Sequence, residues 1–280
     1  MQVLAFVNQK GGCGKTTAAV NLAGALAAMG QRTLLVDLDP QAHATLGLGC
    51  APAPELDATL LDVLAGEASI EDALVAAPGS IWLLPAAANL AQFEEVAARM
   101  IEPEQVLAAR LAEVSELFDC VLLDCPPRAD GVLTANALCA CDTAVLVVET
   151  GAFALQGALA AQRILRERQV EEGQNFELRV LATLFDRRLR IAREILIALQ
   201  ARFGELLFDS VVRESARLRE VAALGQPVQV VDPASRASAD FHSLAQEVLA
   251  LAVRPKSAAP AESEPGSELE RSRRERSSAH

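Results

Sequence analysis

The stretch NQKGGCGKTT, residues 8–17, constrains the fold more than any other part of the sequence. It follows the apolar run VLAFV and precedes an alanine-rich segment of helical length. A strand, a glycine loop and a helix that begins at Gly-Lys-Thr can wrap backbone N–H groups around a phosphate, and the helix N-terminus adds its positive dipole end. The stretch therefore predicts that a nucleotide's phosphates bind at Gly11, Gly12, Cys13, Gly14, Lys15, Thr16 and Thr17.

This loop also holds two of the three lysines of the chain, Lys10 and Lys15, whereas every other basic residue except Lys256 is an arginine. An ammonium group is compact and sits on a flexible stem, so it fits beside a small polyanion where a planar guanidinium is too wide. We expect Lys15 to reach the β- and γ-phosphates of ATP and the Thr16 hydroxyl to bind Mg²⁺. We expect Lys10 to lie beside a phosphate as well; the alternative is that Lys10 is an ordinary solvated charge of the loop.

Apolar runs of strand length alternate with segments of helix length, which is the pattern of a parallel sheet covered on both faces. We predict one doubly wound α/β domain over residues 1–252, with a mostly parallel sheet of about seven to eight strands. The predicted strands are 3–8, 33–39, 81–86, 120–125, 143–149, 178–185 and 206–212. The predicted helices are 16–29, 57–65, 89–117 with a break at Pro103, 132–140, 153–169, 190–203, 215–223 and 237–252.

The C-terminal segment 253–280 is rich in proline, serine and charged residues, so we predict a disordered charged tail. An amphipathic membrane anchor is the alternative, but Leu269 is the only bulky apolar residue after Arg254. The N-terminus does not have the pattern of a secretory signal, and no apolar run is long enough to span a membrane. Together with six cysteines that form no CxxC pair, this predicts a cytoplasmic protein with free thiols.

The loop departs from the common G-x-x-x-x-G-K-[ST] pattern, because Gln9 replaces the first glycine and Lys10 is added. This variant, KGGxGKTT, resembles the deviant Walker A motif of the ParA/MinD superfamily, which includes the ParA/Soj-type partition ATPases. The resemblance extends over roughly residues 1–252 and implies a P-loop NTPase fold. It also implies that Lys10 crosses a dimer interface to the phosphates of the partner's ATP.

Two further motifs carry the resemblance. VDLDPQAHATLGLG, residues 36–49, resembles the second ParA motif, which implies that Asp39 helps to position the attacking water. Asp39 could instead only cap the turn before Pro40. FDCVLLDCPP, residues 118–127, resembles Walker B, which implies that Asp124 holds Mg²⁺ directly or through water.

Arginine is concentrated between residues 160 and 220, although the net charge of the chain is −12. The segments LFDRRLRIARE (184–194) and VVRESARLRE (211–220) resemble two ParA segments, which implies nonspecific DNA contact by Arg188 and Arg217 in an ATP-bound dimer. Arg187, Arg190, Arg213 and Arg219 would assist. The alternative is a solvated face in which Glu194, Glu214 and Glu220 pair with these arginines.

The resemblance implies a slow, Mg²⁺-dependent ATPase that forms an ATP-dependent homodimer and drives chromosome or plasmid partitioning. Its implied partners are nonspecific double-stranded DNA and a ParB-like activator, so the ATP state would lie on the nucleoid. Three alternatives are a positioner of another cargo, a MinD-like membrane-cycling ATPase and a nitrogenase-iron-protein-like electron carrier. The last requires a cluster-binding cysteine shortly after Walker B, and residues 126–133 contain none.

Overall fold

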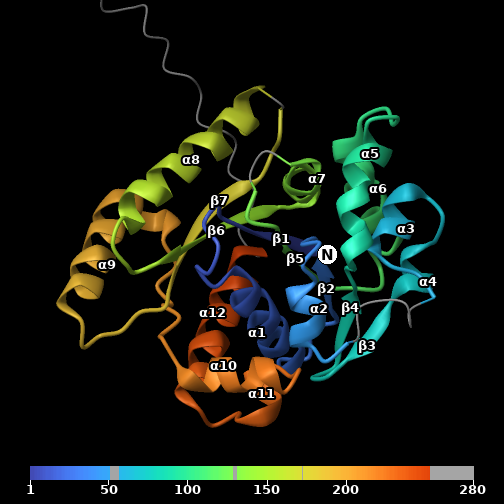
Figure 1. Ribbon diagram of the computed structural model, residues 1–280. Helices are drawn as coiled ribbons and strands as arrows, with labels where there is room; N and C mark the ends of the chain where they lie inside the picture. The colour runs from blue at the N-terminus through green and yellow to red at the C-terminus, as the bar shows by residue number, and fades with distance from the viewer. Residues whose placement is uncertain (51–56, 129–130, 172, 253–280) are drawn as a thin grey trace, which may run out of the picture.

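The structure, a computed structural model, describes residues 1–50, 57–128, 131–171 and 173–252 (Figure 1). Its centre is a seven-stranded sheet in the order β3-β4-β2-β5-β1-β6-β7. Every strand pair is parallel except β3 with β4. The strands are β1 (Gln2–Val7), β2 (Thr33–Asp37), β3 (Val75–Ala77), β4 (Ile81–Leu84), β5 (Cys120–Asp124), β6 (Thr143–Glu149) and β7 (Glu177–Thr183).

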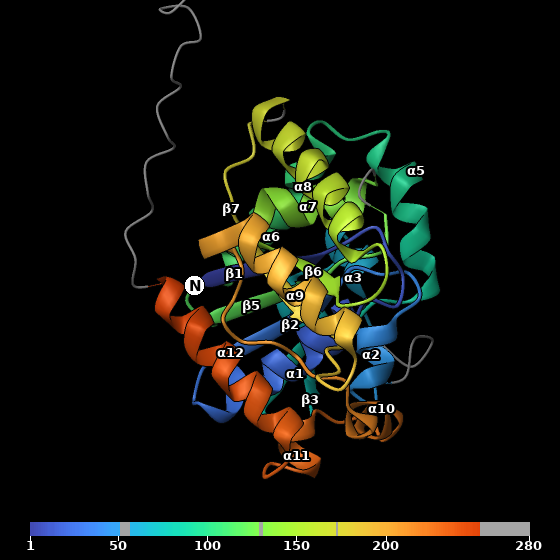
Figure 2. The ribbon, with the colours of Figure 1, turned by 90° about the vertical axis from the view of Figure 1, so that its left-hand side faces the viewer.

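Helices cover both faces of the sheet, as Figures 1 and 2 show. The longer helices are α1 (Lys15–Ala28), α6 (Val106–Glu113), α7 (Val132–Ala140), α8 (Ala154–Glu171), α9 (Arg190–Phe203), α10 (Ala216–Ala223) and α12 (Arg236–Ala252). The shorter ones are α2 (His43–Gly47), α3 (Leu60–Ala65), α4 (Ile70–Ala73), α5 (Phe93–Ala97) and α11 (Val228–Val231). Three 3₁₀ turns occupy Ala88–Gln92, Pro103–Gln105 and Gly204–Leu206.

Strand β1 explains why this sequence needs two helical layers. Its alternate residues point to opposite faces of the sheet. Val3, Ala5 and Val7 join one apolar cluster, which includes residues of α3, α7 and α8. Leu4 and Phe6 join the other cluster, together with residues of α1 and α12. All five side chains are at most 5% exposed, so the strand could not be stable with one bare face.

The predicted fold class is therefore confirmed, and six of the seven predicted strands form. The strand predicted at 206–212 is wrong: this segment makes one isolated bridge to the edge strand β7, between Val180 and Leu207. The physical reason lies in α12, where the Glu247 carboxylate accepts hydrogen bonds from the backbone N–H groups of Asp209 and Ser210 at 2.9 and 2.7 Å. Those two groups are not used for pairing with β7.

The sequence interpretation also missed β3, a three-residue antiparallel edge strand. The predicted helix 89–117 is broken more than expected, because α5 ends at Ala97 and a 3₁₀ turn begins at Pro103 before α6. Proline lacks the N–H that a continuous helix would need there. The short helices α2, α4 and α11 were not predicted. The predicted disordered tail, 253–280, lies outside the described residues.

A surface ion pair ties the start of β2 to the turn before β5. Arg32 donates to Asp119 from Nε at 3.0 Å and from Nη2 at 2.6 Å, and this pairing lowers the pKa of the Asp119 carboxyl to about 2. A folded-state pKa below the ordinary value of about 3.9 gives stability that is present above that value and is lost as the pH falls toward 2.

We therefore expect Asp119→Asn to lower the melting temperature at pH 7 by roughly 1–3 °C, because the pair is partly exposed. The difference from the unmodified protein should shrink steadily between pH 4 and pH 2. Thermal melts by circular dichroism across this range provide the measurement. A difference that stays constant at low pH would show that the carboxylate charge is not the stabilising feature.

Candidate functional site

The glycine loop lies between β1 and α1 at the carboxyl end of the parallel strands, where ligands bind in sheets of this kind. Gly14 is the residue before α1 and has φ +92°, a left-handed conformation that favours glycine. Gly12 has φ +76°, and both Gly11 and Gly12 are exposed. The loop backbone is thus open to solvent at the start of α1, as a phosphate site requires.

Side chains from neighbouring strands fix the shape of this loop. Asn8 Nδ2 donates to the Val147 carbonyl of β6 at 2.6 Å, and its Oδ1 accepts from the Lys10 N–H at 3.0 Å. The Thr183 hydroxyl at the end of β7 donates to the Cys13 carbonyl at 2.7 Å. The Cys13 side chain is buried, and burial raises the pKa of its thiol. The Cys13 thiol therefore packs in the core, and the Cys13 backbone forms part of the loop.

The two lysines of the loop lie in different surroundings. Lys15 is only 7% exposed, and its ammonium donates back to the Lys10 carbonyl at 3.3 Å. The Lys10 side chain is 54% exposed and pairs with Glu149 at the end of β6. Thr16 and Thr17 follow in the first turn of α1, both half-buried. One ammonium thus lies inside the loop and the other at its outer rim.

Asp124 ends β5 directly beside the loop, and it is fully buried. In the described part of the chain, neither of its carboxylate oxygens has a hydrogen-bond partner. Burial raises its pKa well above the usual value, and the nearby Asp37 carboxylate raises it further. The Thr16 hydroxyl and the Lys15 ammonium oppose this shift, although Thr16 does not reach full hydrogen-bond geometry.

The residues around Asp124 have the chemistry that a magnesium site requires. A buried carboxylate with two unpartnered oxygens next to a hydroxyl is a hard-oxygen donor set of the kind that binds Mg²⁺. Among the described residues, no group of three or more His, Cys, Asp or Glu side chains could hold a metal ion by itself. Mg²⁺ commonly takes one or two protein oxygens together with substrate phosphates, and Asp124 and Thr16 could supply the protein oxygens.

Asp39 lies just beyond β2 and is 8% exposed. Its Oδ1 accepts a hydrogen bond from the Gln41 N–H at 2.9 Å, so the turn contact that was the structural alternative is present. The role implied for Asp39 in positioning water stays a prediction. Only one of its two oxygens is used by this turn contact.

Asp37 belongs to the same corner, and the sequence interpretation gave it no role. It is fully buried and is the register partner of Asp124 across β2 and β5. Burial raises its pKa to about 6, although hydrogen bonds from Thr45 lower it. The carboxylate accepts from the Thr45 N–H and hydroxyl at 2.8 Å each, and from the Asp39 N–H at 3.1 Å. Asp37 therefore anchors the loop that presents Asp39.

The arginines predicted to contact DNA lie in two segments that the structure brings together. Phe185 and Arg213 form a parallel bridge, and the Glu214 N–H donates to the Phe185 carbonyl at 3.1 Å. Arg188 pairs with Asp186 at 2.8 Å, and its side chain is 84% exposed. Arg217 pairs with Glu220 at 2.9 Å and with Asp232 at 3.1 Å.

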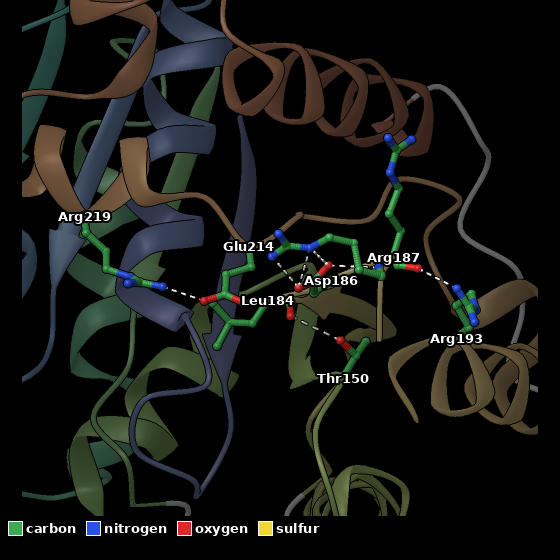
Figure 3. A network of polar contacts seen from close by, with 8 residues as sticks. Thr150, Leu184, Asp186, Arg187, Arg193, Glu214 and Arg219 are labelled. Carbon is green, nitrogen blue, oxygen red and sulfur yellow. Dashed lines mark hydrogen bonds and ion pairs between the residues drawn. The ribbon is translucent and has the colours of Figure 1, made fainter. Parts of the chain in front are cut away.

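Most of the supporting arginines are also paired. The pairs Arg190 with Glu194, Arg219 with Glu214 and Arg217 with Glu220 are those of the solvated-face alternative. Arg187 is the exception: among the described residues its side chain forms no ion pair, and in Figure 3 it extends away from the network around Asp186. DNA contact by Arg188 and Arg217 stays a prediction.

Membership of a protein class now follows from the fold and the loop. A parallel sheet with this glycine loop between its first strand and first helix defines a P-loop nucleotide-binding protein. A family model described as "AAA domain" matches residues 1–180.

Two relatives identify the family. The sporulation initiation inhibitor protein Soj of Bacillus subtilis is 35% identical over 253 residues, which cover 89% of this chain and 98% of that protein. The chromosome partitioning protein ParA of Caulobacter vibrioides is 36% identical over 256 residues, which cover 89% and 94%. The chain therefore belongs to the ParA/Soj family of partition ATPases, as its motifs predicted.

Solved structures agree with the fold. Cobyrinic acid a,c-diamide synthase of Mycobacterium smegmatis, with a bound ATP analogue and magnesium, has a TM-score of 0.77 and 30% identity over 89% of this chain and 94% of that one. The cell division ATPase MinD of Pyrococcus furiosus has a TM-score of 0.71 and 26% identity over 89% and 99%. Within the described ranges, no helix is both long and apolar enough to cross a membrane.

Several residues of the site escaped the sequence interpretation. Glu149 and Thr183 contact the loop across 139 and 170 positions of sequence, and neither belongs to a recognisable motif. Their one common signal is a place in the last residues of a predicted strand, since Glu149 ends the strand predicted at 143–149 and Thr183 lies two residues before the end of the strand predicted at 178–185. The six cysteines form no disulfide among the described residues; Cys50 and Cys139 are partly exposed and the other four are buried.

Proposed function

We propose that this protein is a Mg²⁺-dependent ATPase that dimerises with ATP, binds DNA nonspecifically in that state and drives chromosome or plasmid partitioning. The observation that carries the proposal is the separation of the two loop lysines, with Lys15 buried inside and Lys10 exposed at the rim. An inner ammonium serves the chain's own nucleotide. The outer one, once it leaves Glu149, can reach a nucleotide held by a second copy.

In the proposed reaction, water attacks the γ-phosphate in line with the leaving oxygen. Bound Mg²⁺ would offset charge on the β- and γ-phosphates, and Thr16 and Asp124 would hold it. Lys15 and the backbone N–H groups of the loop stabilise the same charge from the protein side. Asp39, fixed to Asp37 through its backbone N–H, orients the attacking water with its remaining carboxylate oxygen.

A chain of hydrogen bonds supports the proposed link between nucleotide and DNA. Thr183 holds the Cys13 carbonyl of the phosphate loop, and the Thr183 carbonyl accepts from the Thr150 N–H at 3.0 Å. The Thr150 hydroxyl donates to the Leu184 carbonyl at 3.3 Å, two residues before Asp186 and its partner Arg188 (Figure 3). A shift of the loop on ATP binding would therefore reach the arginine segment through few contacts.

The proposed DNA surface consists of Arg188 and Arg217, with Arg187 as a supporting contact. Phosphates can replace the carboxylates that now pair with Arg188 and Arg217, since all these pairs are at least partly exposed. DNA binding should require ATP and should weaken steeply with salt. Fluorescence anisotropy on two DNA duplexes of unrelated sequence tests this with Arg188→Glu and Arg217→Glu. The charge-matched control is Arg99→Glu, which changes an exposed arginine just after α5. Binding that is equal with and without ATP would contradict the proposal.

The Lys10–Glu149 pair leads to a prediction about dimerisation. Lys10 must leave Glu149 before it can reach a second nucleotide, so Glu149→Gln should lower the ATP concentration needed for dimers by about two- to fivefold. The Lys10→Ala variant should have an affinity for ATP within about threefold of that of the unmodified protein, yet it should remain monomeric. Light scattering with a slowly hydrolysed ATP analogue measures both effects. Dimers of Lys10→Ala at the normal nucleotide concentration would refute the shared site.

Other parts of the proposal concern partners and place. A ParB-like protein would stimulate hydrolysis, and the ATP state would lie on the nucleoid in the cytoplasm. The same switch could move a different cargo, and a neighbouring ParB-like reading frame would favour segregation. The MinD-like alternative predicts ATP-dependent sedimentation with liposomes, which the partition ATPase should not show.

A further inference from the structure

Helices α8 and α9 lie side by side on an outer face of the molecule, as Figures 1 and 2 both show. A cavity of about 480 Å³ lies along them, lined almost entirely by one face of α8. The lining residues of α8 are Leu159, Gln162, Arg163, Arg166, Glu167 and Val170, which recur at helical spacing, and α9 adds Arg202. We call this the α8–α9 groove. It is about 16 Å long, since each helical residue rises about 1.5 Å.

The charge of the groove is opposite to that of the whole protein. Three arginines and one glutamate line it, whereas the chain has a net charge of −12. Arg163 pairs with Glu167 at 2.8 Å. Among the described residues, Arg166 and Arg202 have no carboxylate partner, so two guanidinium groups are available to an anionic ligand.

A buried amide gives an independent signal in the same place. Gln162 is 3% exposed, and its Oε1 accepts a hydrogen bond from Arg202 Nη2 at 3.3 Å. Its Nε2 is buried and has no hydrogen-bond partner in the described part of the chain. An unpartnered buried N–H donor is costly, and here it lies beside two guanidinium groups. The Gln162 amide has to turn toward the groove before a ligand can reach its Nε2, and a ligand carboxylate would then accept from this group and from both guanidinium groups.

The shape of the groove distinguishes a peptide from a small anion. Leu159 and Val170 are the apolar ends of the stripe, and the Val170 side chain is exposed. A compact dicarboxylate could not cover both ends at once, whereas an amphipathic helix in a groove contacts residues at this spacing. We propose that the α8–α9 groove binds an acidic amphipathic segment of a partner protein, with a Glu or Asp on Gln162, Arg166 and Arg202 and apolar residues on Leu159 and Val170.

The proposal does not rest on the proposed ATPase cycle, so it is tested on nucleotide-free protein. The probe is a fluorescein-labelled 15-residue helical peptide of Glu, Leu and Ala, compared by anisotropy with the same peptide carrying Lys for Glu. The acidic peptide should bind saturably and the basic one should not. Arg166→Glu and Arg202→Glu should each weaken binding about tenfold, and Arg99→Glu by less than about twofold.

Gln162→Met separates recognition from a structural role. It removes an unsatisfied donor, so the melting temperature should hold or rise while peptide affinity falls about fivefold. Citrate provides the last arm: displacement of the peptide by citrate at a similar concentration would overturn the proposal in favour of a small-anion site. Failure of the acidic peptide to bind, or equal binding by Arg166→Glu, would also overturn it.

Discussion

Replacing Lys15 by alanine is expected to lower the affinity for ATP by at least about 100-fold and to abolish measurable hydrolysis. Lys15 is buried at the start of α1, and its ammonium points back over the loop to the Lys10 carbonyl. In that position it faces the concave side of the loop, where the phosphates would lie. An ion pair formed in such a screened place is worth far more than one on the surface.

The loss of Lys15 should also affect the protein without nucleotide. Lys15 lowers the pKa of Asp124, so its positive charge stabilises the ionised carboxyl group nearby. Without the ammonium, the buried Asp37 and Asp124 carboxyls face each other with less compensation, and we expect the melting temperature to fall by roughly 2–4 °C. Calorimetric titration with ATP measures the affinity, and a thermal melt measures the melting temperature.

Lys10→Ala is the matched control, because it removes the same chemical group from the same loop. It should keep its affinity for ATP and its melting temperature while losing dimers. If the two alanine variants lost ATP affinity equally, the hypothesis that Lys15 binds the chain's own nucleotide and Lys10 that of a second copy would be wrong. If Lys15→Ala still bound ATP at the normal concentration, the loop would not be the phosphate site at all.

The sequence was sufficient wherever local pattern decides structure. β1, β5 and β6 are apolar runs bounded by polar or helix-forming residues, and both faces of each are buried. Because these runs have only five to seven residues, a buried parallel strand suits them better than a helix. The order of strand, glycine loop and helix at the N-terminus was also predicted correctly. Asp124 could be predicted because it ends such a strand.

What the sequence could not provide was contact between distant residues. The segment 206–212 has strand-like composition, but Glu247 on α12 takes two of its N–H groups. Glu149 has no motif to mark it, yet it holds Lys10 because β6 lies next to β1 in the sheet. Arg188 and Arg217 belong to separate segments, and only the bridge at Phe185 brings those segments together.

Asp124→Asn should raise the stability of the protein and lower its ATPase activity. In the nucleotide-free protein we expect the melting temperature to rise by roughly 2–5 °C, because the amide removes a buried group whose ionised form has no hydrogen-bond partner. Burial raises the pKa of this carboxyl well above its usual value, so at neutral pH the folded state disfavours its charge. A residue kept for stability would behave in the opposite way.

The rate of ATP hydrolysis should fall in the same variant. An amide oxygen is a weaker magnesium ligand than a carboxylate, so ATP hydrolysis should drop at least about 100-fold. Magnesium should also no longer add to the stabilisation that ATP gives in a thermal melt. Thr45→Val serves as the control in the same buried corner, since it weakens the Asp37 anchor without touching the metal ligands and should lower stability instead. If Asp124→Asn destabilised the nucleotide-free protein and left turnover intact, Asp124 would be a structural acid and the magnesium site would lie elsewhere.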